Sequence, residues 1–314
     1  MTFLKNIKNI SFSEILLIVL IICFIIVFSN RFLKNSFNKE GFVERKGGFI
    51  RKTDEDVYDD FYVDMYDDLV YNDVKNKYEV ERIFKSDTSN SQYKILDIGC
   101  STGHHVRLLT NSNAEVVGID NSPAMIKKAQ NNYPDLHFKL CDALNTMAFP
   151  SDTFTHITCL YFTIYYIKNK KLFLENCFNW LEPGGVLILH LVDMYNFDPI
   201  IPIATSVPYN RSDSSKDRTT ESKVKFDTLD YKSDFNIDKS IDANSINLDK
   251  PNAVFKETIK LKDPKSVRVN VHNLYMSSQN SVLALAREIG FSLQSQTEMK
   301  DIQYDNNYLY ILQK

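Results

Sequence analysis

The body of the chain alternates short apolar runs with segments in which apolar residues recur every three or four positions. The apolar runs have the length of strands and occur at residues 94–98, 115–119, 136–140, 154–160 and 186–191. The last run is almost continuously apolar, which is typical of a strand buried on both faces of a parallel sheet. The alternation predicts an α/β fold with a doubly wound, mostly parallel, Rossmann-like sheet.

The C-terminal end of the chain continues this pattern. Residues 281–289 have helical spacing and stop at Gly290, which is typical of a helix C-cap. The apolar stretches 291–293 and 308–312 follow and predict two further strands. Added to the five runs above, they give a predicted main sheet of seven strands.

Between these two parts the chain changes character. Residues 210–250 are rich in Ser, Asp, Asn and Lys, and within them 211–222 are predicted to form a flexible loop. Polar and apolar residues then alternate with a period near two at 223–227, 231–235, 254–261 and 267–275. This alternation predicts an accessory antiparallel β-sheet over the ligand-binding edge of the main sheet. A solvent-facing hairpin without function is the alternative.

Upstream of the first strand, apolar residues recur at helical spacing among several aspartates. They are Tyr58, Phe61, Tyr62, Met65, Tyr66, Leu69, Val70 and Val74. The spacing predicts one or two amphipathic helices packed on the domain. Alternatively, some of these tyrosines close over a bound ligand.

The N-terminus contains an unbroken apolar run from Ile15 to Phe28. A helix that crosses a bilayer uses about 20 apolar residues, so this run would recruit its flanks or thin the bilayer locally. Basic residues are more frequent after the run than before it, which places its C-terminal side in the cytosol. We therefore predict a single-pass membrane protein with a cytosolic catalytic domain. A cleaved signal peptide and a buried helix are the alternatives.

Together these patterns divide the chain into five parts. They are a transmembrane anchor (1–34), a basic linker (35–53), a core (54–200), a flexible loop with the accessory sheet (201–276), and a C-terminal helix with the last two strands (277–314).

Composition excludes several classes of function. Of 314 residues, 44% are hydrophobic and 25% are charged, as in an ordinary folded protein. The 37 basic and 40 acidic residues give a formal net charge of −3, so no basic excess favours binding to nucleic acid. The five cysteines have no C-x-x-C spacing and the histidines are scattered, so no metal site is predicted. Unpaired thiols also favour a reducing compartment.

Three aspartates follow predicted parallel strands. Asp97, Asp120 and Asp142 lie at or near strand ends that meet at one edge of the sheet, where such folds bind ligands. Gly99 and Gly103 form a turn between them that lets the backbone approach a ligand closely. Each carboxylate also has a structural alternative, because Asp97 and Asp142 could organise turns.

At this point the sequence blocks resemble class I S-adenosylmethionine-dependent methyltransferases. Residues 96–103 (LDIGCSTG) resemble the first motif, 117–120 (VGID) the second-strand motif and 181–185 (LEPGG) the approach to the fifth strand. Residues 66–79 are similar to the N-terminal lid of a small-molecule branch that includes amino-sugar N-methyltransferases. The resemblance implies S-adenosylmethionine as cofactor, an accessory sheet, and a final strand antiparallel to the rest.

The resemblance also implies a cofactor site. Asp97 and Gly99 would line the methionine end, Asp120 would bind the ribose, and Asp142 with Ala143 would meet the adenine. The other residues that we predict at the cofactor are Tyr66, Ser101, Gly103, Asn121 and Leu160.

Two positions depart from the family pattern. Ser101 replaces the middle glycine of the first motif, where it would crowd the cofactor or hydrogen-bond to it. Thr155 stands where an acidic residue is frequent. Because fold alone never proves activity, these departures keep a non-catalytic homologue as an alternative.

Methyl transfer from a sulfonium mainly requires an acceptor held in line with the S–CH₃ bond. A base is needed only for a protonated acceptor, and His190, His272, Tyr62 and Tyr66 are the candidates. Residues 160–163 read LYFT where base N-methyltransferases carry a [DN]-P-P-[YF] element, which disfavours a nucleic-acid amine. We predict methyl transfer to a small-molecule, sugar or lipid-linked acceptor near a membrane. A protein methyltransferase and a non-catalytic cofactor-binding or scaffold protein are the alternatives.

Overall fold

The computed structural model describes residues 48–85, 93–110, 114–199, 220–246, 248–263 and 265–314. They belong to one compact unit, Gly47–Lys314. The predicted transmembrane anchor at 1–34 lies outside the described residues, as does most of the predicted loop at 211–222. No helix within these ranges is both long enough and apolar enough to cross a bilayer.

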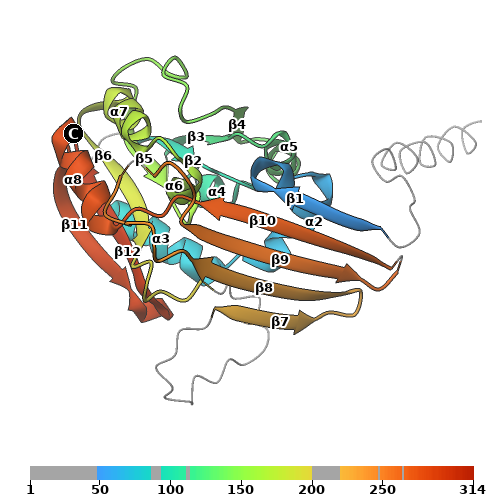
Figure 1. The fold of residues 1–314 in the computed structure, drawn as a ribbon. Helices are drawn as coiled ribbons and strands as arrows, with labels where there is room; N and C mark the ends of the chain where they lie inside the picture. Colours follow the sequence, from blue (N-terminus) through green and yellow to red (C-terminus); the bar gives the residue numbers. More distant parts are fainter. Residues whose placement is uncertain (1–47, 86–92, 111–113, 200–219, 247, 264) are drawn as a thin grey trace, which may run out of the picture. The chain divides into compact units, whose positions relative to one another are not determined.

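Seven strands form the main sheet, in the order β11-β12-β6-β5-β2-β3-β4 (Figure 1). They are β2 (Lys94–Ile98), β3 (Glu115–Asp120), β4 (His137–Leu140), β5 (Phe154–Cys159), β6 (Leu181–Val192), β11 (Ser292–Met299) and β12 (Tyr304–Gln313). β12 pairs antiparallel with both β6 and β11, whereas the pairs from β6 to β4 are parallel. The predicted Rossmann-like α/β sheet with an antiparallel last strand is confirmed.

Helices cover both faces of this sheet. They are α3 (Asp73–Lys85), α4 (His104–Thr110), α5 (Pro123–Asn132), α6 (Thr163–Tyr166), α7 (Lys170–Trp180) and α8 (Gln279–Ile289). Buried side chains of α6, α7 and α8 form one cluster with Leu96, while those of α3, α4 and α5 form another with Ile95. Because successive strand residues point to opposite faces, β2 contributes to both clusters. Each Val, Leu, Ile, Phe or Met side chain that is fully buried stabilises the fold by about 1.5–3 kcal/mol, compared with the same side chain exposed to water.

The boundary between α7 and β6 differs from the prediction. The amphipathic spacing of residues 171–181 predicts a helix that is stopped by Pro183, Gly184 and Gly185. In the structure α7 ends at Trp180, and Leu181 already pairs with Phe154 of β5. The strand pairing of Leu181 therefore ends the helix before the proline and the glycines are reached.

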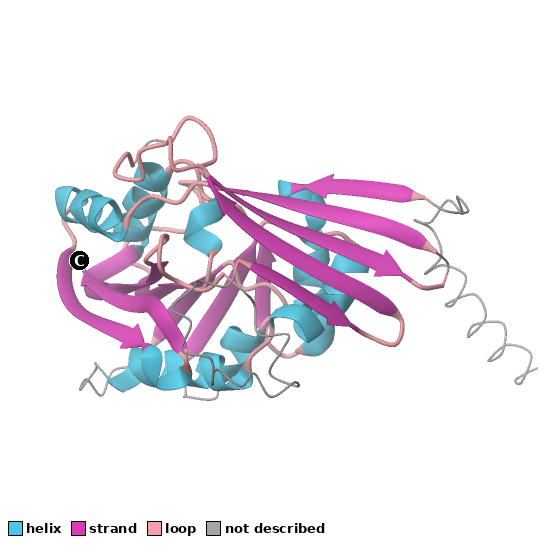
Figure 2. Cartoon of the chain, turned by 60° about the horizontal axis from the view of Figure 1, so that its bottom comes forward, coloured by secondary structure: helices cyan, strands magenta, loops and turns pink. Residues whose placement is uncertain are grey.

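Five strands form a second, accessory sheet in the order β1-β10-β9-β8-β7 (Figure 2). They are β1 (Phe49–Thr53), β7 (Glu221–Lys225), β8 (Leu229–Ile237), β9 (Ala253–Leu261) and β10 (Ser266–Leu274). Four of them are antiparallel as predicted, but β1 pairs with β10 in parallel, so the sheet is mixed. β1 comes from residues that the sequence assigned to a linker. Its FIRKT segment is short and basic, and it has too few apolar residues to predict a strand. Pairing with β10 is what makes it one.

A 3₁₀ turn, η2 (Asp54–Val57), and the helix α2 (Asp60–Val70) follow β1. α2 confirms the predicted amphipathic helix and begins after Asp59, whose carboxylate accepts a hydrogen bond from the Tyr62 N–H. One side of the segment is tied to the accessory sheet, since the Arg268 guanidinium donates to both Asp59 carboxylate oxygens at 2.9 Å. On the other side, the Thr102 hydroxyl donates to Asp67 at 2.6 Å. α2 is therefore clamped between the two sheets.

Candidate active site

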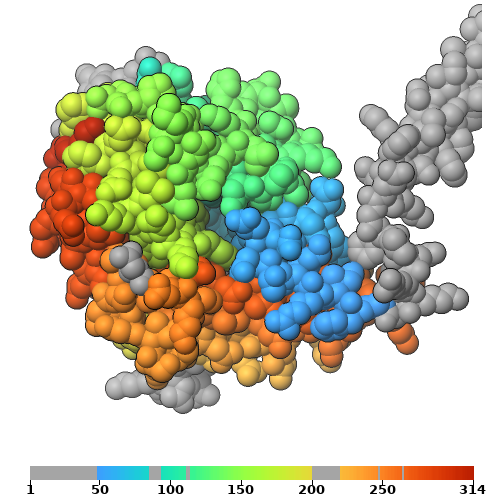
Figure 3. All heavy atoms as spheres, turned by 45° about the horizontal axis from the view of Figure 1, so that its top comes forward, coloured from blue at the N-terminus to red at the C-terminus, as the bar shows by residue number. Residues whose placement is uncertain are grey.

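A cavity of about 460 Å³ lies where η2, α2, the carboxyl ends of β2 and β3, and the accessory sheet meet. In Figure 3 the surface is hollowed where the blue N-terminal segment, the green core and the orange accessory strands come together. Most of the residues predicted for the site line this cavity. They are Tyr66, Gly99, Ser101, Asp120, Asn121, Asp142, Ala143 and His272.

A smaller cavity of about 80 Å³ adjoins the larger one. Asp97 and Leu160 line it, and Tyr66, Gly99 and Ser101 line both cavities. Two predicted residues, Gly103 and His190, line neither cavity. The structure therefore brings the three aspartates together with the turn at Gly99, at one edge of the sheet, as predicted.

The turn after β2 is held in a left-handed conformation. Gly99 has φ +74°, and its N–H donates to the Ile119 carbonyl oxygen at 2.8 Å. A Cβ on Gly99 would lie 2.5 Å from the Thr163 hydroxyl oxygen, so no side chain fits here. Ser101 also has a positive φ, +48°, and its hydroxyl donates to the Gly99 carbonyl oxygen at 3.4 Å. The departure at Ser101 therefore fits the turn and adds a hydroxyl to the cavity wall.

Replacing Gly99 by Ala should destabilise the protein by about 2–5 kcal/mol, because left-handed strain of about 1–2 kcal/mol adds to overpacking of about 1–3 kcal/mol. Gly184→Ala is a matched control, since Gly184 has φ +84° but nothing closer than 3.9 Å to its added Cβ. Urea unfolding of both variants separates strain from clash. Equal losses in the two variants would show that the contact with Thr163 is unimportant.

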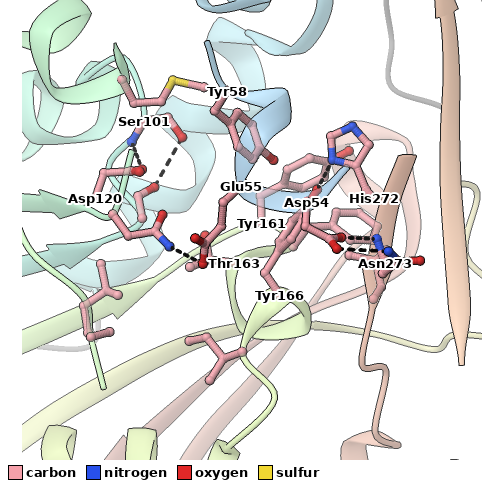
Figure 4. Close-up of a pocket in the computed structure, with 18 of the residues that line it drawn as sticks. Asp54, Glu55, Tyr58, Ser101, Asp120, Tyr161, Thr163, Tyr166, His272 and Asn273 are labelled. Atoms are coloured by element: carbon pink, nitrogen blue, oxygen red, sulfur yellow. Dashed lines mark hydrogen bonds between the residues drawn. The ribbon is translucent and has the colours of Figure 1, made fainter. Parts of the chain in front are cut away.

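Backbone hydrogen bonds fix Asp120 at the end of β3. One carboxylate oxygen accepts from the Ser101 N–H at 3.1 Å (Figure 4). The other accepts from the Ser122 N–H at 2.9 Å. Burial raises the pKa of Asp120 to about 6, although the two backbone donors lower it. The carboxylate is thus pre-oriented along the cavity wall with lone pairs to spare for hydroxyl groups.

Asp97 is 2% exposed and faces the smaller cavity. One carboxylate oxygen accepts from the Thr158 hydroxyl at 2.7 Å, while the other has no hydrogen-bond partner in the described part of the chain. Burial raises the pKa of Asp97. Lys75 lines the same cavity, with its ammonium 2.8 Å from Glu79 and over the ring of Tyr161. A buried acceptor and a buried cation therefore lie in one small space.

Asp142 both organises a turn and lines the larger cavity. Its carboxylate accepts from the Leu144 N–H at 2.8 Å, so it does organise a turn, and it also lines the larger cavity beside Ala143. Asn121 lies at the mouth, where its amide donates to the Glu55 carboxylate at 3.4 Å. This contact brings η2 across the end of β3.

His190 belongs to a different cluster. It is 1% exposed, with its Nδ1 3.0 Å from the Glu79 carboxylate and its Nε2 3.1 Å from the Asn307 amide oxygen. Since both ring nitrogens are engaged away from the cavity, the structure places His190 apart from the other predicted catalytic residues. Gly103 has a packing reason for its lack of a side chain, because an added Cβ would lie 2.7 Å from the Phe138 ring.

Thr155 also lies away from the site. It is at the start of β5, where its hydroxyl donates to the Lys94 carbonyl oxygen at 3.0 Å, and it lines neither cavity. The second departure from the family pattern therefore affects the far end of the sheet and not the ligand-binding edge.

Aromatic residues enclose much of the cavity, and of those named below only Tyr58 was among the tyrosines that the sequence singled out. Those that line it are Tyr58, Tyr161, Phe162, Tyr166, Phe235, Phe255 and Tyr275. The ring centroid of Tyr58 is 5.9 Å from that of Tyr62, 6.4 Å from Tyr66 and 6.3 Å from Tyr166. A signal existed in residues 160–166 (LYFTIYY), a dense aromatic cluster directly after a strand end.

Glu257 was also missed, and it is fully buried behind His272. It accepts hydrogen bonds from the Tyr231 hydroxyl at 2.6 Å and the Asn270 amide at 3.1 Å. Burial raises the pKa of Glu257, but its hydrogen bonds and the nearby His272 lower this pKa by more than burial raises it. The net shift of the pKa is therefore downward. Its signal is an acidic side chain at an inward position of an alternating strand, where an apolar residue is expected.

The charged residues around the larger cavity are mostly acidic. Asp54, Glu55, Asp120 and Asp142 line it, together with His272 and one lysine, Lys168. Lys168 is exposed and lies over the ring of Tyr275. Among the described residues, no three His, Cys, Asp or Glu side chains are grouped as metal ligands. The site therefore offers aromatic faces and acceptor oxygens rather than a cluster of cations.

Comparison with known proteins finds a similarity over part of the chain that forms this site. Residues 95–185 match a protein-family profile described as "Methyltransferase domain". Trans-aconitate 2-methyltransferase of Variovorax paradoxus is 32% identical over 102 residues, which are 32% of this chain and 39% of that protein. The chain thus spans well under half the length of this relative. Residues 95–185 are therefore similar in sequence to methyltransferase domains.

Solved structures share the fold over more of the chain. The CcbJ methyltransferase of Streptomyces caelestis covers 82% of this chain and 98% of its own, with a TM-score of 0.62 and 14% identity. SAM-bound CalS10, an amino pentose methyltransferase of Micromonospora echinaspora, covers 76% and 90%, with a TM-score of 0.53 and 15% identity. At this identity the likeness concerns the fold, which here includes more than the segment matched by the family profile.

Proposed function

We propose that the chain is an S-adenosylmethionine-dependent methyltransferase that acts on a small molecule. The observation that carries the proposal is the meeting of Asp97, Asp120 and Asp142 with the Gly99 turn beside an aromatic cavity. The methyltransferase profile over residues 95–185 supports it, because it covers all four of these residues.

The residues present fit this cofactor. The unpartnered oxygen of Asp97 matches the ammonium of the methionine moiety, and the ammonium of Lys75 in the same cavity matches its carboxylate. Asp120 would accept from the ribose hydroxyls, while Asp142 and Ala143 would meet the adenine. When bound, S-adenosylmethionine supplies a methyl group on a positively charged sulfur.

The chain's own contribution is to hold the acceptor and exclude water. Tyr58, Tyr62, Tyr66 and Tyr166 form a wall on which an acceptor can pack, and His272 lies at its end. Holding two reactants in line can account for about 7–11 kcal/mol of a barrier, so a rigid wall of this kind is a large part of the proposed catalysis.

The charges support a neutral or cationic acceptor such as a sugar. An acceptor with several carboxylates would meet Asp54 and Glu55, the two acidic side chains that the cofactor leaves free, and a single exposed lysine. The name of the trans-aconitate relative therefore carries little weight for the substrate, since the shared segment covers 32% of this chain. The accessory sheet, which forms the acceptor end of the cavity, lies outside the profile match.

The test is incubation of the full chain with methyl-labelled S-adenosylmethionine and size-fractionated cell extract. Label is expected in a low-molecular-mass or lipid-soluble product, and the Asp120→Asn variant should form none. Label confined to proteins would replace the proposal with a protein methyltransferase. Absence of S-adenosylhomocysteine with every fraction would indicate a non-catalytic protein.

We also propose that residues 1–34 anchor the chain in a membrane with the domain on the cytosolic side. The apolar run from Ile15 to Phe28 and the basic residues after it support this. Flotation with phosphatidylcholine vesicles tests it. The full chain should float with the vesicles, whereas a variant with Leu17→Asp, Leu20→Asp and Ile25→Asp should not. Flotation of neither protein would refute the anchor.

A further inference from the structure

Three side chains are joined in series at the end of the larger cavity. The Tyr166 hydroxyl is 3.0 Å from Nδ1 of His272, and Nε2 of His272 is 3.0 Å from the Glu257 carboxylate. Tyr166 and His272 line the cavity (Figure 4). Glu257 does not line it and is fully buried. The three come from α6, β10 and β9, so only the tertiary structure brings them together.

The hydrogen bonds determine where the protons lie. The Glu257 carboxylate already accepts hydrogen bonds from the Tyr231 hydroxyl at 2.6 Å and the Asn270 amide at 3.1 Å, so it acts as an acceptor in this cluster. Nε2 of His272 must then carry a proton and donate it toward Glu257. In a neutral imidazole this leaves Nδ1 as an acceptor, and the Tyr166 hydroxyl donates to it. Both hydrogen bonds of the series are therefore donated in the same direction, from the residue nearer the cavity toward the buried Glu257 carboxylate.

We propose that Tyr166 is a catalytic residue that receives the proton of the methyl acceptor while His272 receives the proton of Tyr166. The inference rests on the proposed function. The acceptor's lone pair forms the bond to the methyl carbon, and the electron pair of the breaking S–CH₃ bond stays on sulfur. The acceptor's proton moves to the Tyr166 oxygen, and the original phenol proton moves to Nδ1 of His272. Tyr166 ends neutral, and the imidazolium is paired with Glu257.

Glu257 acts through His272 and is a positioning residue. It fixes the tautomer and stabilises the imidazolium, as a buried carboxylate does for the histidine of a hydrolytic triad. The titratable groups that face His272 are Tyr58, Tyr62, Tyr166 and Glu257. Arg268, on the same strand, is engaged with Asp59 and Asn270. Glu257 is therefore the carboxylate placed to stabilise a charge on His272.

This arrangement restricts the acceptor's chemistry. A relay that removes a proton is useful only for an acceptor that loses one on methylation, such as a hydroxyl or an amine bearing hydrogen. Carboxylates and thioethers have no proton to give at neutral pH. The relay and the acidic lining therefore select the same class, a neutral or cationic nucleophile.

Nuclear magnetic resonance of the full chain with ¹⁵N-labelled histidine tests the proton positions without an acceptor. At pH 7 His272, assigned by its loss in His272→Asn, should be neutral with its proton on Nε2. Glu257→Gln should change its tautomer, because the Gln amide no longer requires a donor on Nε2. An imidazolium at pH 7, or a proton on Nδ1, would overturn the proposal, because neither form can accept the proton of Tyr166.

Steady-state kinetics test the catalytic role. The substrate is the fraction of cell extract that the wild-type protein labels. Tyr166→Phe should lower kcat about 10²-fold or more, the usual contribution of a general base, with KM and S-adenosylhomocysteine affinity within about twofold. Tyr195→Phe, on an exposed tyrosine outside both cavities, is the control. A Tyr166→Phe variant with the wild-type kcat overturns the relay alone. A wild type that neither binds S-adenosylhomocysteine nor labels any fraction overturns the proposed function as well.

Discussion

Replacing Asp120 by Asn should weaken binding of S-adenosylhomocysteine by at least about 100-fold. The carboxylate is placed to accept from two ribose hydroxyls, and each hydrogen bond to a charged group contributes about 1.5–3 kcal/mol. Two of them correspond to about 3–6 kcal/mol, which is two to four factors of ten in affinity. Isothermal titration calorimetry of the full chain measures the change.

A loss of fold must be separated from a loss of binding in this variant. The Ser101 and Ser122 N–H groups both donate to Asp120, and an amide offers them one oxygen instead of two. Urea unfolding should therefore accompany the titration. Asp135→Asn, at an exposed aspartate outside both cavities, is the matched control and should leave affinity unchanged. Wild-type affinity in a folded Asp120→Asn protein would refute the ribose assignment.

The pKa of Asp120 adds a pH dependence to the same prediction. Burial raises this pKa to about 6 in the free protein, and a ribose that donates to the carboxylate favours its charged form. Affinity should therefore fall as pH decreases below about 6, by up to tenfold per unit.

The raised pKa of Asp120 affects folding stability with the opposite dependence on pH. A raised pKa contributes stability that is fully present below the model-peptide value of 3.8 and is lost as pH rises through about 6.

Replacing Glu79 by Ala should lower the free energy of unfolding by about 3–5 kcal/mol, the usual cost of removing one partner from a buried charge cluster. Glu79 is fully buried and accepts from the Lys75 ammonium at 2.8 Å. Its carboxylate is also 2.8 Å from Nε2 of His105 and 3.0 Å from Nδ1 of His190. Without it, one buried ammonium and two imidazoles lose a common partner. Urea unfolding at pH 7 measures the loss.

The exposed pair of Glu175 and Lys171, at 3.9 Å on α7, provides the control for this variant. Glu175→Ala should cost less than about 0.5 kcal/mol, as exposed helix pairs do. Burial raises the pKa of Glu79, but Lys75 and the two histidines outweigh it and hold the pKa well below 4.5. Its contribution is therefore present above pH 4.5 and is lost as pH falls through the lowered pKa. Similar losses in both variants would show that the cluster contributes little.

Much of the candidate site could be predicted from local sequence signals. Asp97, Gly99 and Asp120 follow apolar runs long enough to identify as parallel strands, and the carboxyl ends of such strands meet at one edge. Their positions depend only on strand direction and spacing. The positive φ of Gly99 was likewise implied by its place in a tight turn.

Other parts of the site depended on contacts that leave little trace in the sequence. β1 is a strand because β10 pairs with it, and its own residues are too few and too polar to indicate one. His190 and His272 are both histidines within apolar strands, yet His190 pairs with Glu79 away from the cavity and His272 faces Tyr166 within it. Strand periodicity predicts which face of the sheet a side chain occupies. It does not predict which element packs against that face.

The sequence by itself determined the α/β core, the order of its strands and helices, and the row of carboxylates at one edge, because these follow from periodicity and turn chemistry over short stretches. The tertiary structure alone decided that α2 is clamped between the two sheets and that Tyr166, His272 and Glu257 form one series. The physical reason is that most of these contacts join residues far apart in the sequence, with separations of 35 positions for Asp67 and Thr102, 106 for Tyr166 and His272, and 209 for Asp59 and Arg268. Their geometry is set by how the two sheets and α2 pack, which no local pattern encodes.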